Sequence, residues 1–239
     1  MKIIAVFKWS RNPQDGRVGM NGTLDWRGVK MAPNDDDPAV MEVANAIVED
    51  GEIVGLTIGD GDIAWAAARG AARTMVVTDA QTEVDSSVTA AVIAAAIKRV
   101  EGVDAVIIGD SGVVSALMGH LGWPAVAGVV SATKEQGRLR VTRKMGTASQ
   151  VLEVEGPVVL AVAANREEKN APGMKEVLFA RKKPVERLTM SDLGLAPAAD
   201  VSSKGTRFPD TPPARMIDGK DPAAACKELM AALRSDGVL

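Results

Sequence analysis

Residues that could act in chemistry gather in one stretch, DAVIIGDSGVVSALMGHLGWP (104–124). Its tetrad Gly109-Asp110-Ser111-Gly112 holds a candidate serine nucleophile, and His120, the only histidine of the chain, follows nine residues after Ser111. On a helix, nine residues correspond to about 13 Å along the axis, which is too far for His120 to accept the Ser111 proton. The Gly-x-Ser-x-Gly elbow of serine hydrolases is also absent. Hydrolysis at Ser111 is therefore the hypothesis that we rank last.

The same stretch could instead hold a phosphate. Small residues between a strand and a helix let backbone N–H groups approach an anion at the helix N-terminus, and 109–113 and 57–65 (TIGDGDIAW) both have that character. In an open α/β sheet both loops emerge at the carboxyl edge, where ligands bind. Asp60, Asp62 and Asp110 would repel a phosphate unless they face away or bind a ribose. Neither loop matches Gly-x-Gly-x-x-Gly or a Walker lysine loop, so an ordinary strand-to-helix turn stays open as a third interpretation.

Short apolar segments alternate with Ala-rich helical patterns along the first half of the chain. The pattern predicts strands at 3–7, 52–59, 74–79 and 104–109 and helices at 38–50, 62–72 and 86–100. This order favours an open, mostly parallel twisted sheet with flanking helices, a Rossmann-like α/β fold. The pattern of residues 125–163 predicts strands with a hairpin turn at Glu135-Gln136-Gly137. Residues 12–28 are predicted to form a hairpin-like excursion.

The composition loosens after about residue 185. Residues 193–220 are rich in Pro, Gly, Ser and charge, which predicts an extended arm that is too polar to form its own core. Residues 221–237 predict an amphipathic helix with Pro222 at its first position. We therefore divide the chain into a nucleotide-binding-like α/β domain (1–184) and an arm (185–239) whose terminal helix docks on a partner subunit.

Composition excludes several function classes. The net charge of −3 offers no basic surface for nucleic acid. Cys226 is the only cysteine, so an internal disulfide is impossible, and no Cys/His cluster has metal-ligand spacing. No segment is apolar enough to span a bilayer, and no cleavage site follows MKIIAVFKW. We expect a cytoplasmic protein without a metal site.

Taken in order, the segments resemble the beta subunit of electron transfer flavoproteins over nearly the whole chain. Residues 57–77 resemble a family stretch that ends Ala-x-Gly-Ala-Asp-Arg, with Ala72 in place of the Asp and Arg73 kept. The other similar segments are the opening strand that ends in a lysine (2–8), the Asn-Pro-x-Asp helix start (32–47), the Val-x-Arg strand with a Gly turn and a Pro-led strand (139–162), and the alanine-plus-basic segment (176–195).

The resemblance implies an electron-carrier subunit that has no catalytic site of its own and pairs with an alpha subunit. In that family the heterodimer carries electrons on FAD between dehydrogenases and downstream acceptors. The FAD is bound mainly by the alpha chain, near the interface, while the beta chain holds AMP or, in electron-bifurcating members, a second FAD. The implied nucleotide site comprises Val6, Asn34, Asp35, Asp36, Asp37, Thr57, Ile58, Gly59, Gly109, Asp110, Ser111, Gly112 and Val113.

Two departures from the family bear on ligands and partners. The loop at 109–113 is shorter than the family's phosphate loop, which leaves AMP, a second FAD or no nucleotide open at this site. A nucleotide-binding regulatory or structural module without electron transfer is therefore the alternative function. Of the family's docking motif Asn-x-Pro-Arg-Tyr, the chain keeps Asn165 and lacks the Arg-Tyr pair.

The resemblance places the docking anchor for a partner dehydrogenase at Met174, which we expect on an exposed loop. The basic residues Arg181 and Lys182, with Lys169, Lys175 and Lys183 near them, either face that partner or form a solvated surface. Near the first strand, Trp9 and Trp26 either approach the flavin or pack against the sheet.

Overall fold

The structure, a computed structural model, describes residues 1–239 except 60, 82–84, 164–167, 169–170, 197–203 and 212. The chain forms two compact units. Unit 1 comprises residues 1–17 and 24–205, and unit 2 comprises residues 18–23 and 206–239. The predicted division after residue 184 stays a prediction.

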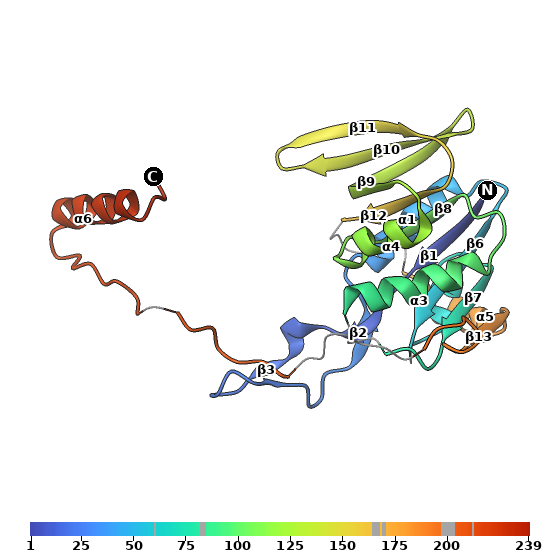
Figure 1. The fold of residues 1–239 in the computed structure, drawn as a ribbon, viewed down its shortest axis with the longest axis horizontal. Coiled ribbons are helices and arrows are strands. Elements are labelled where there is room, and N and C mark those ends of the chain that lie inside the picture. The colour runs from blue at the N-terminus through green and yellow to red at the C-terminus, as the bar shows by residue number, and fades with distance from the viewer. Residues whose placement is uncertain (60, 82–84, 164–167, 169–170, 197–203, 212) are drawn as a thin grey trace. The chain divides into compact units, whose positions relative to one another are not determined.

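Unit 1 is built on a nine-stranded sheet, counted over the described residues (Figure 1). The strand order is β11-β10-β9-β12-β8-β1-β6-β7-β13, in which β11-β10-β9 pair antiparallel and all other neighbours pair parallel. The bounds are β1 (Lys2–Val6), β6 (Glu52–Ile58), β7 (Arg73–Val77), β8 (Ala105–Gly109), β9 (Ala125–Glu135), β10 (Arg138–Met145), β11 (Ala148–Val154), β12 (Val158–Val162) and β13 (Val185–Leu188). The predicted mostly parallel, Rossmann-like sheet and the hairpin at residues 135–137 are both confirmed.

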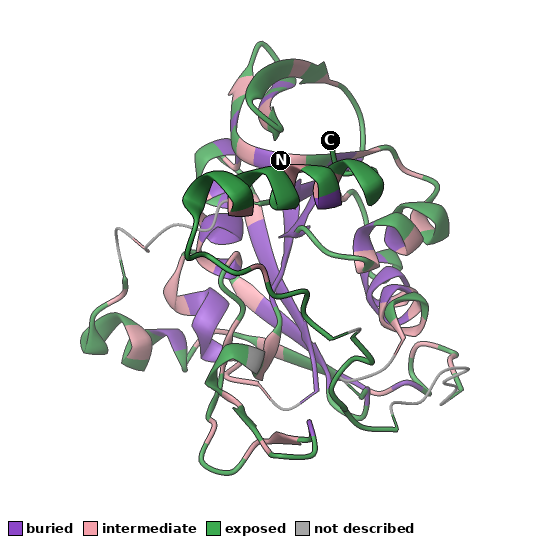
Figure 2. Cartoon of the chain, turned by 90° about the vertical axis from the view of Figure 1, so that its left-hand side faces the viewer, coloured by how far each residue is buried: buried purple, intermediate pink, exposed green. Residues whose placement is uncertain are grey.

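Helices pack on both faces of the central strands, which are buried, whereas the β10–β11 hairpin is largely exposed (Figure 2). Successive residues of a strand point to opposite faces, so Ile3 and Ala5 pack with α1 on one side, whereas Ile4 and Val6 pack with α3 and α4 on the other. The bounds are α1 (Asp37–Ile47), α2 (Ala64–Ala68), α3 (Ser86–Lys98), α4 (Val113–Leu121) and α5 (Met174–Ala180). The apolar strands predicted at 3–7, 52–59, 74–79 and 104–109 are thus central strands.

The excursion after β1 is anchored where it leaves and returns. β2 (Trp9–Arg11) pairs antiparallel with β5 (Met31–Pro33), so the chain returns beside its own start. The predicted hairpin-like segment 12–28 lies between these two strands. It contains the 3₁₀ helix η1 (Pro13–Asp15) and the short strands β3 (Arg17–Val18) and β4 (Leu24–Asp25).

The C-terminal helix α6 (Pro222–Ser235) lies in unit 2. Its N-cap residue Asp221 accepts hydrogen bonds from the Ala223 and Ala224 amides, at 3.0 and 3.3 Å, and Pro222 takes the first helical position as predicted. Leu229 is exposed on this helix. Among the described residues no helix combines the length and apolarity that a membrane crossing requires.

The close approach of α2 to β6 depends on Gly55. A Cβ at Gly55 would lie 2.7 Å from the Ala66 Cβ on α2. We expect Gly55→Ala to force α2 away from the sheet and to lower the free energy of unfolding by about 1–3 kcal/mol, as overpacking does. Urea unfolding followed by circular dichroism measures the change.

Gly119→Ala is the matched control. Gly119 lies in α4, where an added Cβ meets no heavy atom within 4 Å. Because alanine favours a helix over glycine by roughly 0.5–1 kcal/mol, this variant should gain stability. Losses of equal size in both variants would show that close packing at Gly55 is not the cause.

Candidate functional site

A cavity of about 320 Å³ lies at the carboxyl ends of β1, β6 and β8. Three parallel strands end here side by side, which is the position at which open α/β sheets bind ligands. Of the predicted site residues, those that line the cavity are Val6, Asn34, Asp37, Thr57, Ile58, Gly109, Ser111 and Val113.

The other predicted residues do not line this cavity. Asp35 is exposed and Asp36 is the N-cap residue of α1. Gly59 donates its amide to the Val77 carbonyl at 2.9 Å, and Gly112 is the N-cap residue of α4. Asp110 is exposed, and its carboxylate accepts the Gly128 amide on β9 at 2.9 Å.

Two of the three aspartates that were expected to repel a phosphate, Asp62 and Asp110, lie outside the cavity wall. Asp110 is bound to the backbone of β9, and Asp62 accepts the Ala64 amide at the start of α2 at 3.0 Å. Neither carboxylate lines the cavity. Asp60 lies outside the described residues. In the described part of the chain no carboxylate forms an ion pair with Lys8, which is exposed and lines the cavity.

Three helices begin at the cavity. Its wall includes Asp37 from the first turn of α1, Ser86 and Thr89 from the first turn of α3, and Val113, the first residue of α4. Helix N-termini carry unpaired amides and partial positive charge, which favour a bound anion. Asp85 already caps α3 by accepting the Ser87 amide at 2.6 Å, whereas α1 and α4 have no side-chain cap.

Thr57 supplies the clearest sign that a polar ligand belongs here. Its side chain is buried, with only 1% of the residue exposed, and its hydroxyl Oγ1 has no hydrogen-bond partner among the described residues. Leaving a buried hydroxyl unpaired costs about 1–3 kcal/mol. Since Thr57 lines the cavity, a polar atom of a bound molecule would satisfy it.

The sequence analysis did not assign the other wall residues to this site. These are Phe7, Lys8, Trp9, Ser86, Thr89, Ile93 and Ile108. Phe7, Lys8 and Trp9 directly follow the first strand, so their position at the carboxyl edge could have identified them. Ser86 and Thr89 begin the helix after the third strand, whose loop emerges at the same edge.

Asp37 joins the end of β1 to the start of α1. Its Oδ2 accepts the backbone amides of Lys8 and Asn34, both at 2.9 Å. Burial raises the pKa of the Asp37 carboxyl to about 7, while those two amides act in the opposite direction and the neighbouring Asp36 charge raises it further. Asp37 therefore changes charge near neutral pH beside the cavity.

The predicted docking residues lie around α5. Met174 is 82% exposed, but it is the first residue of α5 and does not lie on a loop, so that expectation is wrong. The reason is a helix start that we missed: the Gly173 amide donates to the Glu176 carboxylate at 2.5 Å. Arg181 and Lys182 are exposed, and Lys182 Nζ lies 5.5 Å from the centre of the Phe179 ring.

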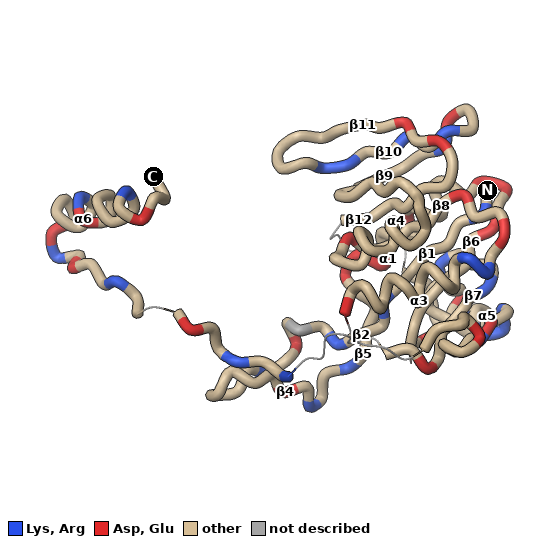
Figure 3. The backbone as a smooth tube through the Cα atoms, viewed as in Figure 1, with Lys and Arg blue, Asp and Glu red and all other residues tan. Residues whose placement is uncertain are grey.

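The remaining basic residues separate into different environments. Lys183 Nζ donates to the carbonyls of Ala67 and Ala71, each at 2.8 Å, so it is a structural residue and does not belong to a solvated surface. Lys175 is exposed on α5, whereas Asn165 and Lys169 lie outside the described residues. Over unit 1 as a whole, basic and acidic residues are interspersed (Figure 3).

The structure also shows where the two tryptophans and the Ser111–His120 candidate pair lie. Trp9 and Trp26 are both half-buried; Trp9 packs against the core, and Gly61 lies against it. His120 is exposed in the last turn of α4, whereas Ser111 precedes the first turn, so this histidine cannot serve as the base for Ser111.

Asp37→Asn tests the effect of the buried carboxyl on stability. An asparagine oxygen can still accept both amides but carries no charge. Below about pH 4 the Asp37 carboxyl is protonated in both states, and between about pH 4 and 7 it is protonated only in the folded state. The free energy of unfolding should therefore fall with rising pH in the wild type, relative to the variant, by about 1.4 kcal/mol per pH unit.

Urea unfolding of ligand-free protein at a series of pH values measures this difference. Asp35→Asn is the control, because Asp35 is exposed and its loss should leave the pH dependence unchanged. Parallel curves for the wild type and Asp37→Asn would contradict the raised pKa.

A comparison with known families gives a match for this chain. A family model described as "Electron transfer flavoprotein domain" matches residues 22–193. This range contains the starts of α1, α3 and α4 and the whole of α5. Proteins of this family carry electrons and generally bind flavin. Because the match spans well over half of the chain, the protein belongs to the electron transfer flavoprotein domain family.

Proposed function

We propose that this chain is the beta-type subunit of an electron transfer flavoprotein. It pairs with an alpha subunit, and the heterodimer carries electrons on FAD from a dehydrogenase to a downstream acceptor in the cytoplasm. Membership of the family supports the electron-carrier role. The resemblance of residues 2–8, 32–47 and 139–162 to beta-subunit segments supports the choice of subunit.

A nucleotide is the ligand that best fits the cavity, and the unpaired Thr57 hydroxyl is the observation that carries this assignment. The starts of α1, α3 and α4 and the Lys8 side chain favour phosphate in the same cavity. A volume of about 320 Å³ lies at the small end of the range of ligand pockets, roughly 300–1,000 Å³. The size therefore favours AMP over a second FAD.

The cavity walls divide into two kinds of surface. Ile93, Ile108 and Val113 offer apolar contact suited to a base, while the hydroxyls of Ser86 and Thr89 offer hydrogen bonds to phosphate. The short loop 109–113 contributes through Gly109, Ser111 and Val113, and helix starts replace the longer family loop. The remaining predicted residues do not line the cavity, and in this proposal they shape the loops that do. They are Asp35, Asp36, Gly59, Asp110 and Gly112.

The flavin is held mainly by the alpha subunit and supplies the reversible electron chemistry. The contribution of this chain is to close the flavin site, exclude water and dock partners. The excursion between β2 and β5, which carries Trp26 and follows Trp9, is the element that approaches the flavin in this proposal. This role requires no bond-making residue in the chain.

Two surfaces serve partners. On α5, Met174, Leu178 and Phe179 are exposed apolar side chains, and Arg181 and Lys182 follow directly. This composition suits a redox partner dehydrogenase with an apolar patch bordered by acidic residues, because charge complementarity speeds encounter. The second is helix α6 at the end of the C-terminal arm, which docks on the alpha subunit through the side of the helix that carries Leu229.

Co-expression with an alpha subunit tests the proposal. We expect a yellow heterodimer with flavin absorbance and AMP released by heating, whereas the chain purified alone should be colourless. A colourless chain that does not associate with the alpha subunit would contradict the proposal. Nucleotide retained by a chain that ignores the alpha subunit would favour a regulatory or structural module instead.

Thr57→Val should change binding and stability in opposite directions. Valine has the shape of threonine but lacks the unpaired hydroxyl, so the ligand-free protein should gain about 1 kcal/mol in its free energy of unfolding. The variant cannot hydrogen-bond the ligand, and its affinity for AMP should fall about tenfold, as for one lost hydrogen bond. Urea unfolding and isothermal titration calorimetry measure the two effects.

Thr74→Val is the matched control. Thr74 is equally buried on the neighbouring strand β7, but its hydroxyl donates to the Ile63 carbonyl at 3.0 Å. Its loss should lower stability by about 1 kcal/mol and leave AMP affinity unchanged. If Thr57→Val lost stability as Thr74→Val does, the Thr57 hydroxyl would have a partner in the free protein.

A further inference from the structure

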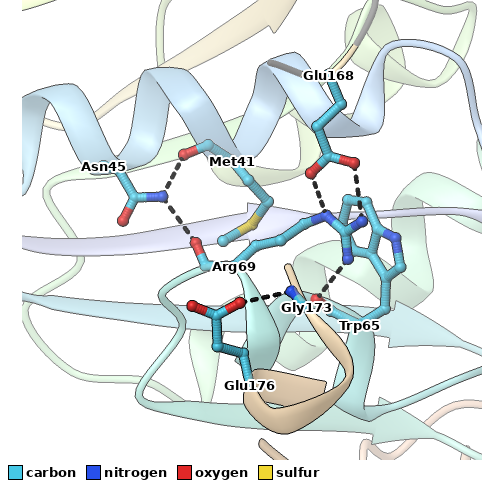
Figure 4. Close-up of polar contacts among 7 residues, drawn as sticks. All are labelled: Met41, Asn45, Trp65, Arg69, Glu168, Gly173 and Glu176. Atoms are coloured by element: carbon cyan, nitrogen blue, oxygen red, sulfur yellow. Dashed lines mark hydrogen bonds and ion pairs between the residues drawn. The ribbon is translucent and has the colours of Figure 1, made fainter. Parts of the chain in front are cut away.

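An enclosed ion pair connects the end of α2 to the chain that precedes α5. Arg69 Nε and Nη2 donate to the two carboxylate oxygens of Glu168, at 2.7 and 2.9 Å (Figure 4). The Arg69 and Glu168 side chains are only 14% and 19% exposed. A bidentate pair that is largely shielded from water is stronger and more directional than a surface ion pair.

Arg69 is itself held rigidly. Its Cζ lies 4.2 Å from the centre of the Trp65 ring, and its Nη1 donates to the Trp65 carbonyl at 3.2 Å. Trp65 is buried, and its ring packs on Phe7 with centroids 5.2 Å apart. The Arg69 side chain of the ion pair therefore packs against residues of the hydrophobic core.

A further contact joins this platform to α1. Asn45 Nδ2 donates to the carbonyls of Arg69 and Met41, each at 2.8 Å (Figure 4). Gly70 allows this approach, because a Cβ there would lie 2.3 Å from Asn45 Oδ1. Arg69 is thus held by α1 as well as by its own helix.

The chain after α5 is attached to the same helix α2. Ala180 packs with Ala64 and Ala67, and Lys183 Nζ donates to the carbonyls of Ala67 and Ala71. Helix α5 is therefore flanked by two attachments to α2, the Glu168 ion pair before it and Lys183 after it. Its apolar side chains Met174, Leu178 and Phe179 nevertheless stay exposed.

We propose that Arg69 and Glu168 form a positioning pair for redox-partner docking. Together with Lys183, the pair presents the exposed side chains of α5 in one arrangement before the partner arrives. A partner then avoids the entropic cost of ordering this segment, and preorganisation of this kind raises affinity. The inference rests on the proposed function, in which α5 is the docking surface.

Glu168→Gln in the flavin-loaded heterodimer tests the pair, since glutamine keeps the size of glutamate but not its charge. The probe is a purified flavin dehydrogenase chosen because it reduces the wild-type heterodimer. We expect the KM for the heterodimer to rise about tenfold with kcat unchanged. Flavin content and the rate of reduction by dithionite should stay at the wild-type values. Arg69→Lys, which keeps the charge but not the bidentate geometry, should give an intermediate KM.

Glu153→Gln is the matched control. Glu153 pairs with Arg138 at 3.4 Å on the β10–β11 hairpin, with 68% of its side chain exposed, so its loss should leave the KM unchanged. Hydrogen exchange of the α5 amides should accelerate in Glu168→Gln and not in Glu153→Gln. Lower thermal stability of Glu168→Gln with an unchanged KM would overturn the positioning role.

Phe179→Ser separates failure of this inference from failure of the proposed function. If Phe179→Ser and Glu168→Gln both leave the KM unchanged, α5 is not the docking surface, and the docking part of the proposed function fails. If only Phe179→Ser raises the KM, docking on α5 stands and the positioning role of the ion pair is wrong.

Discussion

The parallel pairing of β1 between β6 and β8 is the constraint on which the rest of the structure depends. Ala5 lies opposite Gly55 on one side and Ile107 on the other, so the three strands end at the same edge. Each segment that leaves this edge must return along a face of the sheet before the next parallel strand begins. The helices α1, α3 and α4 make that return, and their first turns lie at the cavity. Partial positive charge thus gathers at the cavity without a cluster of basic side chains. Such an edge suits the binding and orientation of an anionic group, as we propose, and that role needs no catalytic triad.

Much of the fold could be predicted from the sequence because its signals are local. Strand β1 and helix α3 follow from apolar periodicity, and a parallel sheet follows from their alternation. For the site, the family resemblance named residues that do line the cavity, such as Thr57 near the end of β6 and Asn34 before α1. The hydrogen bond between Asp110 and Gly128 depends on where β9 lies in the sheet. The sequence alone therefore could not show that the Asp110 carboxylate binds β9 and does not line the cavity.

The basic segment after α5 shows the same limit. In sequence, Arg181, Lys182 and Lys183 form one run of equivalent charges. In the structure Lys183 binds carbonyls at the end of α2, while Arg181 and Lys182 stay exposed. The division arises because carbonyls at the end of α2, which have no partner within the helix, lie within reach of Lys183 in the turn after α5. A helix end therefore binds one lysine within the fold, and its two neighbours stay exposed.

The unpaired Thr57 hydroxyl lowers the stability of the ligand-free protein. Thr57 has a buried hydroxyl without a partner among the described residues, whereas the equally buried Thr74, one strand away, donates to Ile63. Valine at position 57 would pack as well and remove a penalty of about 1–3 kcal/mol, so stability alone does not account for this threonine. The ligand that we propose would account for it, because one of its polar atoms would pair with the hydroxyl. Binding then stabilises the folded state by RT ln(1 + [L]/Kd), so the side chain that weakens the free chain strengthens the loaded one.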